Sequence, residues 1–247
     1  MTVIPLSEGA FTIDKTKVFV PFNTDSDKVQ ERPTGSLLVE IQPFAVINDA
    51  DILLLDTGLG FTDASGTLQI HKHLMLHNIN PMDVTKVLLS HLHKDHSGGV
   101  GRFDAALNRK VAAFPNATYY VNKAEFEAAM SKTNPSYITN DFDILADLPN
   151  VVFTADDGII DNYITYHVTH GHSVHHQVFF ITDGNDTIFF GGDDAPQLQQ
   201  MKNRFIAKYD FDGKKCMELR KEWWEKGAEE KWKFLFYHDI KSPVFQI

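Results

Sequence analysis

Cysteine is nearly absent from this chain. The one thiol, Cys216, has no partner for an intramolecular disulfide and no second sulfur nearby in the sequence that could share a metal ion with it. The sequence therefore excludes a disulfide scaffold and a zinc site built from several cysteines. We predict that Cys216 takes no part in the functional site.

Long apolar runs and basic stretches are also missing. No run approaches the roughly 20 apolar residues of a membrane-spanning helix, and residues 1–10 lack the basic start and apolar core of a secretion signal. Only 23 Lys and Arg residues stand against 33 Asp and Glu residues, which gives a formal net charge of -10. Such a charge repels polyanions. We therefore expect a cytoplasmic protein that acts on a small-molecule substrate and binds neither nucleic acid nor a membrane.

The apolar content, in contrast, is sufficient for one large core. Hydrophobic residues make up 43% of the 247 positions and aromatic residues 12%, which fits a well-packed globular chain of this length. The sequence shows no internal repeat, low-complexity tract or linker. These features predict a single domain over residues 1–247.

Short β-rich segments bounded by turn residues alternate with helical patterns along the chain. Between two of these segments, the residues DGND at 183–186 are typical of a hairpin turn. The order of strands, helix, strands, helix and strand predicts a layered α/β domain in two halves. The expected strands cover residues 18–22, 37–41, 45–48, 52–56, 84–90, 163–169, 177–182, 187–190 and 233–237. The expected helices cover residues 68–76, 123–130 and 214–225, and residues 131–150 are expected to form a loop or cap.

Three of the twelve histidines lie in the segment HLHKDH at residues 91–96, directly after an expected strand. Residues i and i+2 of an extended segment point to the same side, so His91 and His93 can hold one ion. The turn that follows can direct Asp95 and His96 toward a second position. Imidazole and carboxylate groups are ligands that zinc and similar transition ions accept. An ordinary surface loop would explain one histidine but not this cluster.

Three more expected strands end in residues of the same kind. His172 follows one of them in the segment THGH at residues 169–172, Asp193 follows another in FGGD at 190–193, and His238 follows the last. Four strand ends that each carry ligand-type side chains predict a metal site at one edge of packed sheets.

Taken in chain order, these segments resemble the metallo-β-lactamase superfamily, with its His-x-His-x-Asp-His motif, Thr-x-Gly-His segment, Gly-Asp pair and final His. The resemblance covers nearly the whole chain and implies an αββα sandwich, an α/β (α+β) fold. It also implies two divalent metal ions, zinc or alternatively manganese, iron or cobalt. In the family pattern, one ion is bound by His91, His93 and His172, the other by Asp95, His96 and His238, and both by a bridging Asp193.

Two further residues match family positions beside the ligands. Asp56 matches an early family aspartate that can orient a ligating imidazole by accepting its other N–H, and a helix or turn cap is the alternative role. His176 matches a second family histidine, to which we assign a supporting role. Two departures lie close by, because His170 replaces the common Pro of the family and His175 its common Gly.

Two metal ions can activate water, polarise a carbonyl or phosphoryl oxygen and stabilise a leaving oxygen, which together describe hydrolysis. The resemblance therefore implies a metal-dependent hydrolase with a bridging hydroxide as nucleophile, in which Asp95 also carries a proton to the leaving group. β-Lactamases typically have a Cys where Asp193 stands, and glyoxalase II enzymes carry a C-terminal helical part for which the residues after His238 leave no room. Because residues 209–220 are also similar to lactonase and methyl-parathion-hydrolase-like groups, we expect a lactone or carboxylic ester as substrate.

Other functions remain open on the sequence. An organophosphate or phosphodiester hydrolase would use the same ligands, a mononuclear iron enzyme of the persulfide-dioxygenase type would need only three of them, and a binding protein would need no complete set. Acyl-homoserine lactonases commonly place a Tyr three residues after the bridging Asp, where this chain has Pro196. The exact substrate, the physiological metal, the oligomeric state and the source of any assisting phenol are not fixed by the sequence.

Overall fold

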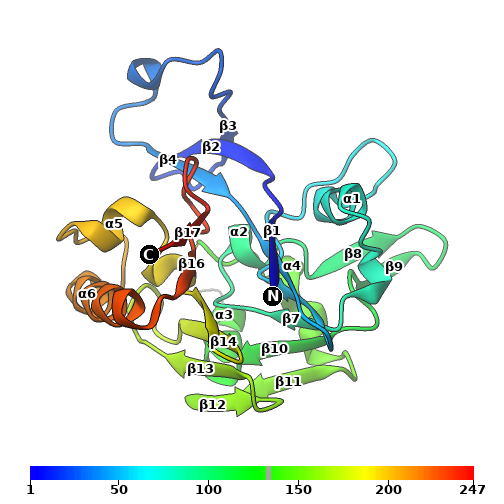
Figure 1. Cartoon of the computed structure of the whole chain (residues 1–247). Helices are drawn as coiled ribbons and strands as arrows, with labels where there is room; N and C mark the ends of the chain where they lie inside the picture. The colour runs from blue at the N-terminus through cyan, green and yellow to red at the C-terminus, as the bar shows by residue number, and fades with distance from the viewer. Residues whose placement is uncertain (132–134) are drawn as a thin grey trace.

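Two six-stranded sheets form the centre of the computed structural model, which describes residues 1–131 and 135–247 (Figure 1). The first sheet has the order β1 (Thr2–Pro5), β5 (Phe44–Ile47), β6 (Ile52–Leu55), β7 (Lys86–Leu88), β10 (Thr118–Asn122) and β11 (Val151–Thr154). The second has the order β12 (Asp157–Ile160), β13 (Ile164–Val168), β14 (Gln177–Asp183), β15 (Asp186–Phe190), β16 (Lys233–Leu235) and β17 (Val244–Gln246). Each sheet combines parallel and antiparallel pairs, such as parallel β6–β7 and antiparallel β5–β6.

Smaller elements surround these sheets. A three-stranded sheet contains β3 (Val20–Pro21), β2 (Gly9–Ile13) and β4 (Leu37–Ile41), and a two-stranded sheet contains β8 (Gly101–Asp104) and β9 (Arg109–Ala112). The α-helices are α1 (Gln69–Leu76), α2 (Lys94–Ser97), α3 (Lys123–Met130), α4 (Thr139–Phe142), α5 (Leu198–Lys202) and α6 (Gly213–Glu230). Short 3-10 helices are η1 (Val29–Glu31), η2 (Pro81–Asp83), η3 (Asp143–Ala146) and η4 (Gly192–Asp194). In the parts of the chain that the structure describes, no helix is long and apolar enough to cross a membrane.

Alternating side chains on the strands create the layers. In β6, Leu53 and Leu55 face the second sheet and share a buried cluster with Phe179 of β14, whereas Leu54 faces the other way and shares a cluster with Leu74 of α1. Complete burial of each such side chain stabilises the fold by roughly 1.5–3 kcal/mol. The first sheet is therefore covered on both faces, by the second sheet and by helices.

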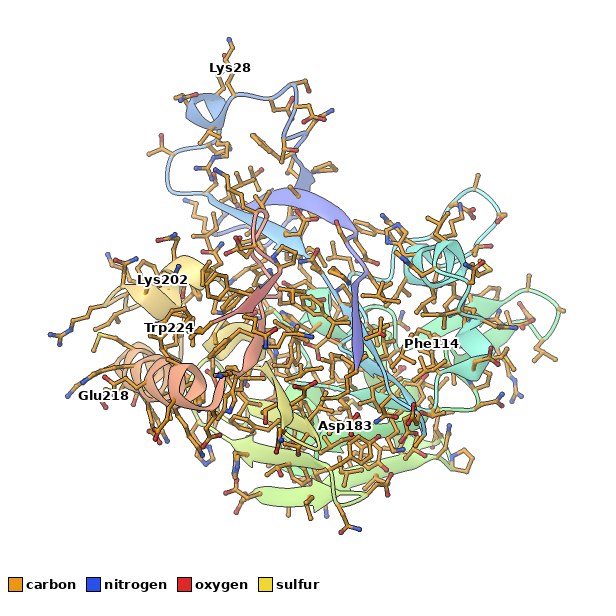
Figure 2. All side chains as sticks on the ribbon, in the orientation of Figure 1. Lys28, Phe114, Asp183, Lys202, Glu218 and Trp224 are labelled. Atoms are coloured by element: carbon orange, nitrogen blue, oxygen red, sulfur yellow. The ribbon has the colours of Figure 1, made fainter. Side chains whose placement is uncertain are left out.

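The second sheet is covered on its outer face by α5 and α6. Phe189 of β15 packs against Trp223 of α6, with ring centroids 4.8 Å apart. Lys202 of α5 places its ammonium 5.6 Å from the ring of Trp224, and Figure 2 shows these two side chains between the helices. Helix, sheet, sheet and helix thus follow one another, and the predicted αββα sandwich is confirmed.

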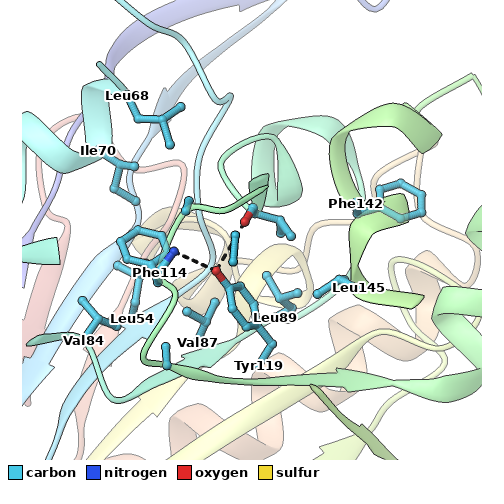
Figure 3. Packing of buried hydrophobic residues seen from close by; sticks show 14 of the residues in the cluster. Leu54, Leu68, Ile70, Val84, Val87, Leu89, Phe114, Tyr119, Phe142 and Leu145 are labelled. Atoms are coloured by element: carbon cyan, nitrogen blue, oxygen red, sulfur yellow. Dashed lines mark hydrogen bonds between the residues drawn. The ribbon is translucent and has the colours of Figure 1, made fainter. Parts of the chain in front are cut away.

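A buried phenol in the first sheet connects the core to the loop after α2. The hydroxyl of Tyr119, in β10, accepts a hydrogen bond from the N–H of Phe114 at 2.9 Å and donates one to the carbonyl of Val100 at 3.3 Å (Figure 3). A buried hydroxyl without such partners would destabilise the core by about 1–3 kcal/mol. The segment after the histidine cluster is therefore anchored in the apolar core.

An arm of residues 14–36, which includes β3, extends beyond β2 and β4 of the three-stranded sheet, with Lys28 near its tip (Figure 2). Its base touches the histidine cluster, because Lys94 Nζ donates a hydrogen bond to the carbonyl oxygen of Lys17. The same ammonium lies 5.1 Å from the ring centroid of Phe19. The arm is thus held beside the segment that carries Asp95 and His96.

Most expected elements are present, with shifted ends. The expected strand at 18–22 is reduced to two residues, and the expected helix at 214–225 continues to Glu230 and ends at Lys231, which has a left-handed φ of 58°. Residues 131–150 are not only loop, since they contain α4 and η3, and residues 132–134 of that segment lie outside the described part of the chain. The sequence patterns did not indicate β1, β2, β17 or the strands from β8 to β12. These strands are short, and several have exposed side chains, so alternation was a weak signal.

Candidate metal centre

The chain after β7 delivers four of the predicted ligands within six residues. β7 ends at Leu88, and His93 is the N-cap residue of α2 but makes no capping hydrogen bond with its side chain. Its imidazole instead lies beside that of His172, with 3.1 Å between His93 Nδ1 and His172 Nε2. Asp95 and His96 lie in the single turn of α2, which changes the direction of the chain after the extended segment. The predicted turn between the two pairs of ligands is this helix.

Glycine allows the loop after β6 to lie directly against α2. The amide of Gly98 donates to the carbonyl of Gly58 at 2.9 Å, and the amide of Thr57 donates to the carbonyl of His96 at 2.7 Å. A Cβ on Gly98 would overlap the backbone of Leu59, and one on Gly99 would overlap the carbonyl of Thr57. The Ser-Gly-Gly sequence after His96 thus permits a backbone contact that a larger residue would prevent.

The second sheet delivers the remaining three ligands at its strand ends. His172 lies in the loop between β13 and β14, where its amide donates to Asp194 Oδ1 at 2.6 Å. Asp193 lies in η4, directly after β15. His238 follows β16, and its Nδ1–H donates to the carbonyl of Glu40 at 2.7 Å.

The predicted ligands come together as two groups. All seven are at least partly buried, and the ligand atoms of each group lie within 4.8 Å of one another. One group is His91, His93, His172 and Asp193, and the other is Asp95, His96 and His238. This division matches the one that the family pattern implies.

The Asp193 carboxylate lies between the two groups. Its Oδ2 is 3.2 Å from His172 Nε2, whereas its Oδ1 is 3.2 Å from His96 Nε2 and 2.9 Å from His238 Nε2. Each oxygen therefore faces the imidazoles of a different group. A carboxylate in this position has the geometry needed to bridge two ions.

Unpaired buried atoms indicate that the residues present fit divalent metal ions. The Nε2 atoms of His91, His93 and His96 and the Oδ1 atom of Asp193 are buried without a hydrogen-bond partner of acceptable geometry in the described residues. Leaving such polar atoms unpaired costs about 1–3 kcal/mol each, so their convergence on one place requires a partner. Nitrogen and carboxylate oxygen donors are those that zinc binds.

Burial and neighbouring charges shift the pKa values of ligand side chains at the centre. Burial and the neighbouring imidazoles lower the pKa values of His91 and His93 well below the usual range, so both rings are neutral and able to bind a metal. Burial lowers the pKa values of His172 and His238, but the carboxylates beside them, Asp193 foremost, together outweigh it and the net shift is upward. Conversely, these imidazoles hold the pKa of Asp193 well below its usual range despite burial.

Asp56 and His176 both contact ligand-bearing segments. Asp56 is fully buried, and its Oδ2 accepts hydrogen bonds from His96 Nδ1–H and from Ser90 Oγ, each at 2.7 Å. Its Oδ1 accepts the Ser90 amide at 2.7 Å. His176 Nε2 accepts the amide of Asp193 at 3.1 Å. Asp56 is thus placed to orient the His96 imidazole, and it also accepts from the residue directly before His91.

Several residues near the centre were not identified from the sequence. His172 Nδ1–H donates to Asp210 Oδ1 at 2.9 Å, and Asp194 Oδ2 lies 3.0 Å from His176 Nδ1. The Cys216 thiol, which we predicted to be outside the site, donates to Asp194 Oδ1 at 3.3 Å and so belongs to the layer behind the ligands. The adjacent carboxylate of Asp194 was visible in the sequence as a neighbour of Asp193, but no local pattern indicated the other contacts.

Aromatic rings flank the first group of ligands. The ring centroid of Tyr137 lies 4.8 Å from that of His93, and the centroid of Tyr209 lies 6.0 Å from that of His172. Tyr209 is 40% exposed. Its phenol keeps its proton, because burial and the charges of Asp193 and Asp210 raise its pKa. A neutral phenol is therefore present beside the site, although Pro196 occupies the position where lactonases commonly have a Tyr.

The departure at His170 changes the backbone of the His172 loop. His170 has a left-handed φ of 53°, and its Nδ1 contacts the carbonyl of Val174. A proline, which is common there in the family, is restricted to φ near −65° and could not adopt this conformation. The loop therefore takes a path that suits this chain's own residue.

The chain matches a family model along most of its length and curated proteins along part of it. The model of one family, the metallo-beta-lactamase superfamily, matches residues 38–223. N-acyl homoserine lactonase AttM of Agrobacterium fabrum is 35% identical over 113 residues, which are 41% of this chain and 37% of that protein. AttM of Azorhizobium caulinodans is 33% identical over 114 residues, 42% of this chain and 38% of that protein. The matched segments thus span less than half of either relative.

Solved structures show the same fold over nearly the whole chain. A probable metal-dependent hydrolase from Staphylococcus aureus has a TM-score of 0.76 at 18% identity, covering 99% of this chain and 91% of that one. AidC, a dizinc quorum-quenching lactonase in complex with its product N-hexanoyl-L-homoserine, has a TM-score of 0.72 at 21% identity, covering 98% and 88%. At these identities the similarity is one of architecture.

Proposed function

Since the chain belongs to the metallo-beta-lactamase superfamily, we propose that it is a metal-dependent hydrolase with two divalent ions and a lactone or carboxylic ester as substrate. One observation carries the proposal. Seven side chains from four strand ends form two compact groups, and the carboxylate of Asp193 faces both. A binding module has no need of such a complete pair of ligand sets.

The ligands are assigned by the two groups, with Asp193 shared between them. When bound, two divalent ions would polarise the substrate carbonyl and activate the attacking water. Asp95 has a second role in this proposal, the transfer of a proton to the leaving oxygen of the substrate. It is 9% exposed, its Oδ2 lies 3.6 Å from His238 Nε2, and Tyr237 Oη holds its backbone by donating to the Asp95 carbonyl at 2.6 Å.

A carbonyl substrate is favoured by the residues around the ions. Asp193 stands where β-lactamases typically have a Cys, and the net charge of -10 disfavours a polyanion. The rings of Tyr137 and Tyr209 beside the histidines offer apolar contact to an acyl group. The curated relatives named as lactonases match only part of their length, so they support this substrate class without fixing the substrate.

A hydrolysis screen of the zinc-loaded protein tests the proposal. The panel contains acyl-homoserine lactones, γ-lactones, aryl esters, a phosphotriester, a glutathione thioester, a β-lactam and RNA, and kcat/KM is compared across it. We expect a lactone or aryl ester to be best, Asp193→Ala to abolish turnover, and Asp49→Ala, an exposed carboxylate between β5 and β6, to leave it unchanged. A phosphotriester preferred by tenfold or more, about 1.4 kcal/mol of transition-state preference, would replace the lactonase proposal with an organophosphatase.

A further inference from the structure

A buried carboxylate outside the histidine cluster contacts three segments that surround the first group of ligands. Glu125 lies in the first turn of α3, with 1% of its surface exposed, and its amide donates to the N-cap residue Asn122 at 3.0 Å. Burying a carboxylate is costly unless hydrogen bonds replace its water. The partners of Glu125 therefore show what this carboxylate is placed to hold.

Two of its hydrogen bonds go to residues adjacent to ligands. Glu125 Oε1 accepts the amide of Leu92 at 3.1 Å, and Leu92 is the residue between His91 and His93. Glu125 Oε2 accepts Ser173 Oγ at 3.0 Å, and Ser173 directly follows His172. One carboxylate thus connects the two segments that contribute all three histidines of the first group.

The third hydrogen bond goes to the aromatic ring beside the site. Tyr137 Oη donates to Glu125 Oε1 at 2.8 Å, while the ring of Tyr137 packs against His93. The neighbouring residue Ser136 offers its carbonyl to the amide of Lys94 at 3.0 Å. Residues 135–138 are therefore attached to the ligand segment both directly and through Glu125.

The second group of ligands is held by other residues. His96 is oriented by Asp56, His238 by the carbonyl of Glu40, and the backbone of Asp95 by Tyr237. Loss of Glu125 would leave three donors unpaired beside the first group and would leave these other contacts in place. Loss of Glu125 should therefore disturb the first group of ligands more than the second.

We propose that Glu125 is a positioning residue for the half of the metal centre formed by His91, His93 and His172, and that it also fixes the ring of Tyr137 against that half. The inference rests on the proposed metal centre but not on the identity of the substrate. Residues that orient metal ligands typically change metal affinity about 10–100-fold when removed.

The test measures zinc affinity of each half separately, by competition with a chelator. A His238→Ala background retains the first group, and a His172→Ala background retains the second. We expect Glu125→Ala to weaken zinc binding at least tenfold in the first background and less than threefold in the second. Glu125→Gln should recover most of the loss, because its carbonyl oxygen can still accept from Leu92 and Tyr137.

Control variants separate positioning from general damage to α3. Glu127→Ala, an exposed carboxylate on the same helix, should change neither affinity. If Glu125→Ala does not fold, Tyr137→Phe and Ser173→Ala each remove one hydrogen bond and should each weaken the first group alone. Equal weakening of both halves, or unchanged affinity in every variant, would overturn the proposal. A wild-type protein that binds no zinc would overturn the metal centre itself and this inference with it.

Discussion

At the level of single residues, buried carboxylates surround the candidate metal centre, each against a different ligand-bearing segment. Asp56 contacts His96, Asp210 contacts His172, and Glu125 contacts the backbone between His91 and His93. The bonds of Asp56 and Asp210 fix which ring nitrogen is free to bind a metal and how the ring is oriented, whereas that of Glu125 fixes the backbone between two ligands. The chemistry of the ligands therefore depends on residues that never touch a metal ion.

Replacing Asp56 by Asn tests this dependence at the second group. Asn tolerates the left-handed φ of 57° found at this position, so the backbone is preserved. Its NH2 group, however, accepts no hydrogen bond, so either the Ser90 amide or both His96 Nδ1–H and Ser90 Oγ–H would lose their acceptor. We expect a 10–100-fold loss of zinc affinity in chelator competition, with Asp49→Asn as the exposed control. Unchanged affinity would reduce Asp56 to a strand-end cap.

Glu8 predicts a pH-dependent stability that comes mainly from the burial of its own carboxyl group. Burial raises its pKa to about 7 although the amide of Leu59 donates to it at 2.7 Å. The unfolded chain has the ordinary value near 4.5, so the folded protein holds the proton more tightly between pH 4.5 and 7. The stability provided by the protonated form is complete below pH 4.5 and is lost as the pH rises through 7.

The matched variant Glu8→Gln lacks this titration. Between pH 4.5 and 8, the wild-type protein should lose on the order of 3 kcal/mol of unfolding free energy relative to Glu8→Gln. Urea unfolding of both proteins in excess chelator measures the difference without a contribution from bound metal. If the unfolding free energies of the two proteins change with pH in parallel, the pKa of Glu8 is not raised by folding.

At the level of elements, the loop after β6 and the segment after α2 depend on close backbone approach. Gly98 has a helical φ of −58°, which alanine adopts readily, so the close backbone of Gly58 and Leu59, and not the conformation, prohibits a side chain. We expect Gly98→Ala to lower the unfolding free energy by about 2 kcal/mol or more. Gly101→Ala is the control, because the nearest atoms there belong to the flexible side chain of Lys110. A loss below about 0.5 kcal/mol in urea unfolding would mean that the loops separate easily.

The strands also show how much of the fold the sequence could predict. Strands such as β6, β14 and β15 were predicted because their apolar residues are continuous or lie beside a strong turn signal at 183–186. Short strands such as β8 and β12, with partly exposed side chains, carry little periodicity and were missed. The ligands were identifiable because they cluster in short motifs. Glu125 was not, since its partners Tyr137 and Ser173 are distant in sequence and meet it only in the folded chain.

At the level of the whole molecule, the candidate centre exists only where the two sheets meet. Gln177 at the start of β14 joins them, because its side chain donates to the carbonyl of Leu89 at 2.7 Å and its amide to that of Ser90 at 2.9 Å. Ligands from both sheets then converge on Asp193. Any ion that binds only this assembled state stabilises the whole fold.

A zinc titration shows whether hydrolysis by this protein needs two metal ions. Zinc is added to the metal-free protein, and the rate of hydrolysis of its best carboxylic substrate is recorded against zinc equivalents per chain. We predict no turnover without zinc and a plateau at two equivalents, because in our proposal each group of ligands would hold one ion and the Asp193 carboxylate, which faces both groups, would serve both. A plateau at one equivalent, or full turnover in excess chelator, would contradict the account.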